Sequence, residues 1–207
     1  MQESRVEIRG IFPTPIYSYK MNRSFNSSEL KFLEKSKKHF FKNEGNTTTI
    51  DNYILNKKPF SKLKKELELR VNDYFDKVIC PSNKIVPYIT QSWLNFTKTK
   101  EYHHKHSHPN SIISGVLYMD CNEQYDKIRF HRDYIPRVFE IEKKEYNYWN
   151  SDTWWFSVKT GELLLFPSTL THDVQTKEGS NTRTSLAFNV FIKGTLGSNR
   201  QLTELKL

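Results

Sequence analysis

The sequence predicts a mainly β protein, a sandwich or barrel with a helical layer at its N-terminal end. Apolar residues recur with a helical period in the first third of the chain and with a period of two from residue 85 onward. The strands implied by the second period are short and separated by polar turns, as in sandwiches and barrels. With 207 residues and no internal repeat, the chain is expected to form a single domain, with an N-terminal layer at 1–84 and a β core at 85–207.

The N-terminal layer begins with a strand that the sequence restricts to a sheet edge. Residues 11–19 alternate like a strand, but Pro13 and Pro15 lack the N–H groups that a central strand needs. A helix is then predicted from Ser27 or Ser28 to about Phe41. The residues expected on its apolar face are Leu30, Leu33, Phe40 and Phe41.

A second helix is predicted from Pro59 to about Ile79, after a polar loop at 43–49. Its apolar residues keep a period close to 3.6: Phe60, Leu63, Leu67, Val71, Tyr74 and Phe75. Beyond it, period-two alternation predicts strands at 85–97, 112–119, 128–131, 161–166, 172–175 and 182–192. The two helices are therefore expected to cover one face of a β-sheet.

Composition excludes several classes of protein. No run approaches the 18 apolar residues of a membrane span, so no membrane association is expected. Cys80 and Cys121 make neither a disulfide framework nor a metal knuckle, and 7 glycines form no phosphate loop. Without a signal sequence, a cytoplasmic location is expected, that of a host cell if the chain is viral. The net charge of +9 indicates either an anionic partner or a compositional bias toward lysine.

Histidines are the chemically informative residues of this sequence. Four of the seven lie within six residues, in the segment YHHKHSHP, and His172 follows the apolar run GELLLFPSTLT. Residues two apart on a strand point to the same face, so His106 and His108 can aim at one point. With His172 they would make a facial metal site that leaves positions open for substrate or oxygen.

Two points about this metal site stay open at the level of sequence. The pair His104 and His106 has the same spacing and competes with His106 and His108. Neutral imidazoles also suit Fe(II) and Zn(II) about equally, so the ligands alone do not select the metal. A histidine-rich polar turn with no specific ligand is the alternative interpretation.

The last predicted strand carries polar residues on one of its two faces. Arg183, Ser185, Ala187 and Asn189 share that face, and Leu186, Phe188, Val190 and Ile192 share the other. An arginine that points into a barrel is costly unless it binds an anion. The guanidinium fork fits a carboxylate through two parallel hydrogen bonds, and the Ser185 hydroxyl can add a third.

These segments together resemble the Fe(II)- and 2-oxoglutarate-dependent oxygenases, and most closely the small group common in marine phages and bacteria. The resemblance runs from IFPTPIY near the N-terminus to the last strand. Its strongest pieces are HSHPNSIISGVLYM, GELLLFPSTLTHDV and RTSLAFNV. The fold that it implies is a double-stranded β-helix, a jelly-roll or cupin-like barrel.

The resemblance also implies roles for individual residues. His106, His108 and His172 would hold the iron, although most of the superfamily has a carboxylate where this chain has His108. Arg183 would bind the distal carboxylate of 2-oxoglutarate with Ser185 as its helper, and Tyr118 and Asn95 are weaker candidates for the same cosubstrate. Fe(II), 2-oxoglutarate and O2 are thus expected, with ascorbate as a reductant.

The resemblance implies hydroxylation of an unactivated C–H bond, with a prolyl or other protein side chain as the leading substrate. A small metabolite and a nucleobase are the other substrates considered. Two alternatives stay open: a three-histidine, cupin-type oxygenase that needs no 2-oxoglutarate, and an inactive basic barrel that binds nucleic acid or a virion protein. An aromatic insert at 131–157 is expected to form a lid, a substrate-reading element or the contact of a homodimer.

Overall fold

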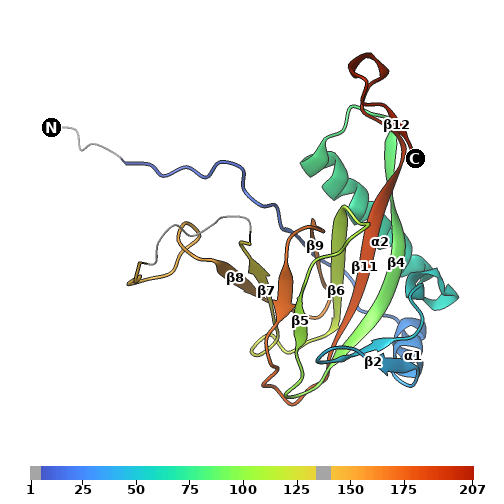
Figure 1. Cartoon of the computed structure of the whole chain (residues 1–207). Coiled ribbons are helices and arrows are strands. Elements are labelled where there is room, and N and C mark those ends of the chain that lie inside the picture. The colour runs from blue at the N-terminus through green and yellow to red at the C-terminus, as the bar shows by residue number, and fades with distance from the viewer. Residues whose placement is uncertain (1–5, 134–140) are drawn as a thin grey trace.

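A computed structural model describes residues 6–133 and 141–207 and folds them into two antiparallel sheets, one of which is covered by helices (Figure 1). The larger sheet has the order β1-β9-β6-β11-β4-β3-β2, and β12 pairs with β11. Its strands are β1 (Tyr17–Lys20), β2 (Phe40–Lys42), β3 (Thr47–Thr49), β4 (Ile85–Thr97), β6 (Ile113–Asp120), β9 (Glu162–Pro167), β11 (Arg183–Leu196) and β12 (Leu205–Lys206).

The smaller sheet has the order β5-β10-β7-β8. Its strands are β5 (His103–His106), β7 (Lys127–His131), β8 (Thr153–Ser157) and β10 (His172–Val174). The two sheets are open and do not close into a continuous barrel, and their topology is that of a jelly roll. The mainly β fold with N-terminal helices that the sequence predicts is therefore confirmed.

The first helix of the helical layer is shorter than predicted. Helix α1 (Ser27–Ser36) begins with a capping box between Asn26 and Glu29, but it ends at Ser36 and not near Phe41. Phe40 and Phe41 instead form β2, which pairs with β3 inside the predicted polar loop. The helix predicted from the spacing of these two residues is therefore wrong at its end, because aromatic and threonine side chains favour strand pairing.

Helix α2 (Ser61–Tyr74) confirms the second prediction and is followed by one wide turn, η3 (Phe75–Ile79). Single turns of 3-10 helix are η1 (Ile54–Asn56), η2 (Lys58–Phe60) and η4 (Asn199–Gln201). The apolar stripe of α2 packs on the larger sheet in one large buried cluster. Phe32 of α1 packs edge-on against Phe60, with ring centroids 5.1 Å apart.

Strand β11 is central in the larger sheet and separates two environments. Leu186, Phe188 and Val190 face the helices and belong to their apolar cluster. Its other face lies toward the smaller sheet, where a second buried cluster contains Tyr118, Leu164 and Phe166. The alternation of polar and apolar residues along β11, as predicted from the sequence, thus places its polar face between the two sheets.

Strands β8 and β12 were not predicted, and neither were β2 and β3, whereas β5 was expected only through the spacing of His106 and His108. Strand β8 lies at the end of the predicted 131–157 insert and forms the free edge of the smaller sheet. The insert residues Tyr134, Arg137 and Phe139 lie outside the described part of the chain. Among the described residues, no helix has the length and apolarity needed to cross a membrane.

Candidate functional site

Three histidine rings meet between the two sheets. The ligand atoms of His106, His108 and His172 all lie within 4.8 Å of one another. The ring centroids of His106 and His172 are 4.4 Å apart, and those of His106 and His108 are 4.9 Å apart. This spacing allows one metal ion to contact all three side chains, as the sequence motif predicts.

Strand register brings these histidines together from distant parts of the sequence. His172 of β10 is the direct partner of His106 on the antiparallel neighbour β5. The prediction that His106 and His108 lie on one strand is only half right, because β5 ends at His106. The backbone N–H of His108 instead donates to the Ser168 carbonyl at 3.0 Å, which turns the His108 ring back toward the other two.

Backbone carbonyls orient two of the three rings. The Nδ1–H of His106 donates to the His104 carbonyl at 2.7 Å, and that of His172 donates to the Leu170 carbonyl at 3.0 Å. With Nδ1 protonated, the lone pair of each neutral ring is on Nε2, the atom that is left to bind a metal.

Burial keeps these imidazoles uncharged at neutral pH. Burial, together with the neighbouring His106 ring, lowers the pKa of His172 to about 3 and the pKa of His108 to about 4. Burial also lowers the pKa of His106. Metal ligands must be deprotonated, so this environment prepares all three rings for coordination.

The competing histidines form a second group that shares one member with the first. His103, His104 and His106 also place ligand atoms within 4.8 Å of one another. This group lacks the distant His172, and all three of its members come from the single strand β5. The geometry therefore favours His106, His108 and His172, with the cavity described next lying directly beside them.

Polar residues line a cavity of about 40 Å³ beside the histidines. Antiparallel register places Asn95 of β4, Ser185 of β11 and Tyr118 of β6 in one row across the larger sheet. All three side chains are nearly fully buried and line the cavity. Phe166, Val116 and Ile128 form its apolar wall. The sequence-predicted residues Asn95, Tyr118, Arg183 and Ser185 thus come together with all three histidines.

Arg183 is the buried cation of this cavity. It is only 3% exposed, and one of its guanidinium nitrogens donates to the Lys127 carbonyl at 3.1 Å. Its Nε atom is buried without a partner, and so are Oδ1 of Asn95 and Oγ1 of Thr97. Thr97, the β4 partner of Arg183, was missed in the sequence because threonine is common in strands. Unpaired buried polar atoms are costly, which indicates a polar ligand here.

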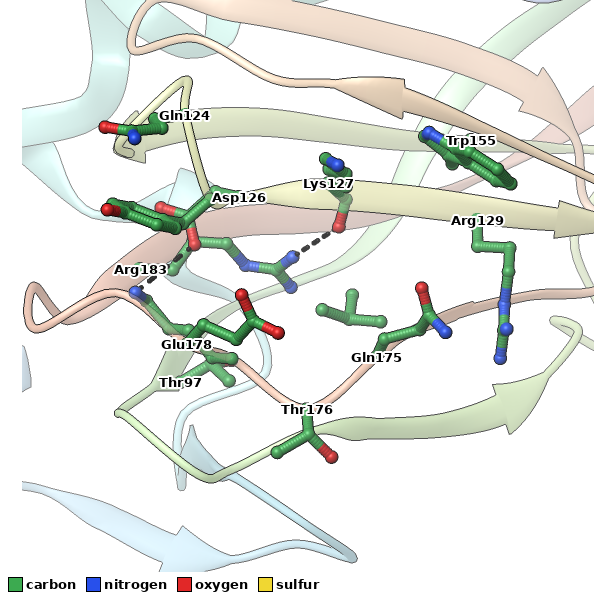
Figure 2. A pocket seen from close by; sticks show the side chains of 13 residues that line it. Thr97, Gln124, Asp126, Lys127, Arg129, Trp155, Gln175, Thr176, Glu178 and Arg183 are labelled. Carbon is green, nitrogen blue, oxygen red and sulfur yellow. Dashed lines mark hydrogen bonds and ion pairs between the residues drawn. The ribbon is translucent and has the colours of Figure 1, made fainter.

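A larger pocket of about 330 Å³ opens on the other side of Arg183 (Figure 2). Figure 2 shows the guanidinium of Arg183 reaching the Lys127 carbonyl, with Arg129, Trp155 and Gln175 farther along the pocket. Arg183 lines both this pocket and the cavity beside the histidines. The cation is therefore reachable from both spaces.

Behind the histidines, Asp173 is the neighbour of His172 on the outward side of β10. Arg129 binds both of its carboxylate oxygens, at 2.9 and 2.5 Å, and His131 lies 3.2 Å from one of them. Burial alone would raise the pKa of Asp173, but hydrogen bonding and charge from Arg129 outweigh it and lower the pKa. His131 thus belongs to the same cluster of charged and polar side chains as Arg129 and Asp173.

Comparison with known proteins agrees with this fold. Residues 91–189 match the family model described as "Putative 2OG-Fe(II) oxygenase". This stretch runs from β4 to β11 and contains every residue of the cavity named above. The site-bearing region is therefore similar to the 2OG-Fe(II) oxygenase family, and the resemblance seen in the sequence motifs is confirmed. No curated protein sequence matches the chain.

Solved structures match over most of the chain at low identity. HygX from Streptomyces hygroscopicus, solved with nickel, 2-oxoglutarate and hygromycin B, is 11% identical over 86% of this chain and 82% of its own, with a TM-score of 0.55. A prolyl-4-hydroxylase from Pseudomonas putida is 11% identical over 85% and 92%, with a TM-score of 0.53. The viral collagen prolyl hydroxylase of Paramecium Bursaria Chlorella virus-1, solved with 2-oxoglutarate, is 12% identical over 84% and 94%, with a TM-score of 0.53. These likenesses establish the shared fold.

Proposed function

We propose that this chain is an Fe(II)- and 2-oxoglutarate-dependent dioxygenase that hydroxylates an unactivated C–H bond. The observation that carries the proposal is that Arg183 is buried without a carboxylate partner among the described residues. Its side chain lines the same cavity as three converging neutral imidazoles. In the described part of the chain, no carboxylate forms an ion pair with this guanidinium. The match of residues 91–189 to the 2OG-Fe(II) oxygenase family model supports it, and so do the fold neighbours HygX and the viral prolyl hydroxylase, both solved with 2-oxoglutarate.

The residues present fit both groups that the proposal requires. His106, His108 and His172 would hold Fe(II), which imidazole nitrogen suits, through rings already neutral and, for two of them, already oriented. Arg183 would bind the distal carboxylate of 2-oxoglutarate with Ser185 and Tyr118 beside it, which would satisfy a guanidinium that has an unpartnered Nε. Asn95 and Thr97 offer further hydrogen bonds.

Iron with 2-oxoglutarate would supply O2 activation and the oxidation of the substrate C–H bond. The protein's own part is to hold the ligand rings in position and to exclude water from the site. The Nδ1–H bonds to backbone carbonyls hold two ligand rings in place, and the aromatic rings of Phe130 and Phe166 pack against His172, with centroids 6.1 and 4.9 Å from it. This apolar wall keeps solvent away from the reacting centre.

The substrate approach is a groove of about 270 Å³ that reaches the histidines from the side of β2 and β4. Trp93 stacks on His108 with centroids 5.9 Å apart, and Asn43, Asn52 and Gln91 line the groove with amides. None of its lining residues is Lys, Arg, Asp or Glu. This supports an uncharged reacting group, as in a prolyl or other protein side chain, and favours it over a phosphate-bearing group at the metal.

Anaerobic titration tests the proposal. Fe(II) is added to the protein, 2-oxoglutarate is titrated, and the visible absorption of the bound pair is followed. We expect a weak charge-transfer band that saturates at one equivalent, and we expect Arg183→Met to raise the Kd for 2-oxoglutarate at least ~100-fold, since a buried charge-assisted pair is lost. Arg200→Met, at an exposed arginine of η4, is the matched control.

A second candidate rests on one observation, that the ligand set is entirely imidazole. Some metal oxygenases of cupin type use such a set without 2-oxoglutarate. In the same titration, iron that binds tightly while no band develops would favour this second function. If iron itself does not bind, both candidate functions would be rejected in favour of an inactive basic protein that binds nucleic acid or a virion protein.

A further inference from the structure

A buried ion pair lies next to Arg183 and takes no direct part in the proposed chemistry. Lys177 and Asp126 are 4% and 2% exposed, and the Lys177 ammonium lies 3.5 Å from the Asp126 carboxylate. The ammonium also donates to the Asn181 side-chain oxygen at 2.7 Å and to the Gly179 carbonyl at 2.9 Å. Asn181 in turn donates to Asp126 at 3.2 Å, which closes a small polar network.

This network touches both segments that hold Arg183. Asp126 immediately precedes Lys127, whose carbonyl accepts the hydrogen bond from the guanidinium. Lys177, Gly179 and Asn181 form the turn that leads into β11, which begins at Arg183. In Figure 2, Asp126 lies beside the side chain of Arg183 at one end of the same pocket. Two cations and one carboxylate, each almost fully buried, thus share one corner of this pocket.

A buried carboxylate needs a cation, and this corner offers two. Lys177 satisfies Asp126 together with Asn181 and the Asn122 N–H, which donates to Asp126 at 2.7 Å. Arg183 is therefore left without a carboxylate partner. Removal of the ammonium would leave the Asp126 charge partly unpaired beside the only other buried cation of the pocket lining, and Arg183 would be drawn to it.

We propose that Lys177 is a positioning residue that reserves Arg183 for the cosubstrate by neutralising Asp126. This inference rests on the proposed function, in which Arg183 binds the distal carboxylate of 2-oxoglutarate. It adds that the affinity for a dicarboxylate is set by competition between an external carboxylate and an internal one. Lys177 itself contacts neither the cosubstrate nor the metal.

The test compares three variants with the wild type as Fe(II)-loaded proteins without oxygen, by calorimetric titration of 2-oxoglutarate. Lys177→Met, which keeps the length of the side chain, is expected to raise the Kd at least ~10-fold. Asp126→Asn removes the competitor and is expected to leave the Kd within about twofold of the wild type. The double variant Asp126→Asn with Lys177→Met is expected to recover most of the lost affinity. Fe(II) affinity should stay the same in all four proteins.

The outcomes separate the competing explanations. A merely structural role predicts that Asp126→Asn and the double variant bind 2-oxoglutarate as poorly as Lys177→Met, and that result overturns the inference. Wild-type affinity in Lys177→Met also overturns it, and leaves the proposed function intact. A wild-type protein that binds iron but not 2-oxoglutarate removes the proposed function and this inference with it. If Lys177→Met does not fold, Lys177→Gln takes its place with the same expected loss of affinity and the same expected rescue by Asp126→Asn.

Discussion

The two faces of the larger sheet are built from the same strands and have opposite characters. On the helix face, Leu94, Leu117 and Phe188 join the helices in an apolar cluster in which each is almost fully buried. On the inner face, the same strands bury Asn95 and Ser185 in a cavity beside three histidines. Apolar burial stabilises a fold, whereas unpaired buried polar atoms destabilise it. The helix face thus stabilises the fold, and this stability offsets the cost of burying polar residues on the inner face.

The largest effect expected from this contrast is on the helix face. The Phe188 ring lies directly over Gly115, where an added Cβ would come within 2.1 Å of it. Phe188→Ala should therefore leave an unfilled space and lower the free energy of unfolding by about 4 kcal/mol, measured by urea denaturation. Asn95→Ala, at a similarly buried position on the inner face, should change it by less than about 1 kcal/mol, because its amide oxygen has no partner to lose. Equal losses in the two variants would contradict the division of roles.

The next effect is on metal affinity. His172→Ala removes the residue that pairs with His106 across β10 and β5. We expect the Kd for Fe(II) or Ni(II) to rise at least ~100-fold, more than the loss of an outer-sphere partner causes. His39→Ala, at an exposed histidine, is the control and should bind metal like the wild type. Metal binding that survives in His172→Ala would transfer the site to the group of His103, His104 and His106.

The smallest of the three effects is the acid sensitivity of the metal-free protein. The pKa of His172 is about 3 in the folded protein against 6.5 in a free side chain, so below pH 6.5 only the unfolded chain takes up this proton. Stability is thus unaffected above pH 6.5 and falls as the pH drops through the window from 6.5 to about 3, by roughly 1.4 kcal/mol per pH unit for one group. At pH 5, His172→Ala should gain roughly 2 kcal/mol relative to the wild type, compared with the difference at pH 7.5. Parallel stability curves for the two proteins would show that this histidine is not buried as described.

The chemistry of the inner face was readable from the sequence to a large extent. Alternation along β11 correctly separated Arg183 and Ser185 from Leu186 and Phe188, because a strand has only two faces. The spacing of His106 and His108, with His172 after a buried strand, located the histidine cluster. What the sequence did not reveal was Thr97 and the pair of Asp126 and Lys177, since nothing in their local pattern differs from ordinary strand and turn residues.

The helical layer shows the opposite limitation. Phe40 and Phe41 satisfy a helical period as extensions of α1, yet they pair with β3 at the edge of the larger sheet. Local periodicity cannot decide between the two, because pairing depends on a partner strand that the segment meets only in the folded chain. The same reason hid β8 and β12, which are short and defined by their neighbours.

The sequence by itself determined which side chains could do chemistry and on which side of each strand they lie, because these follow from residue type and the period of two. Only the tertiary structure decided which of them meet. His172 lies 66 residues after His106, and antiparallel register makes them partners. Arg183 reaches the Lys127 carbonyl across 56 residues, and Lys177 pairs with Asp126 in the same corner. Such contacts depend on how two sheets stack, and their energy comes from burial that no isolated segment possesses.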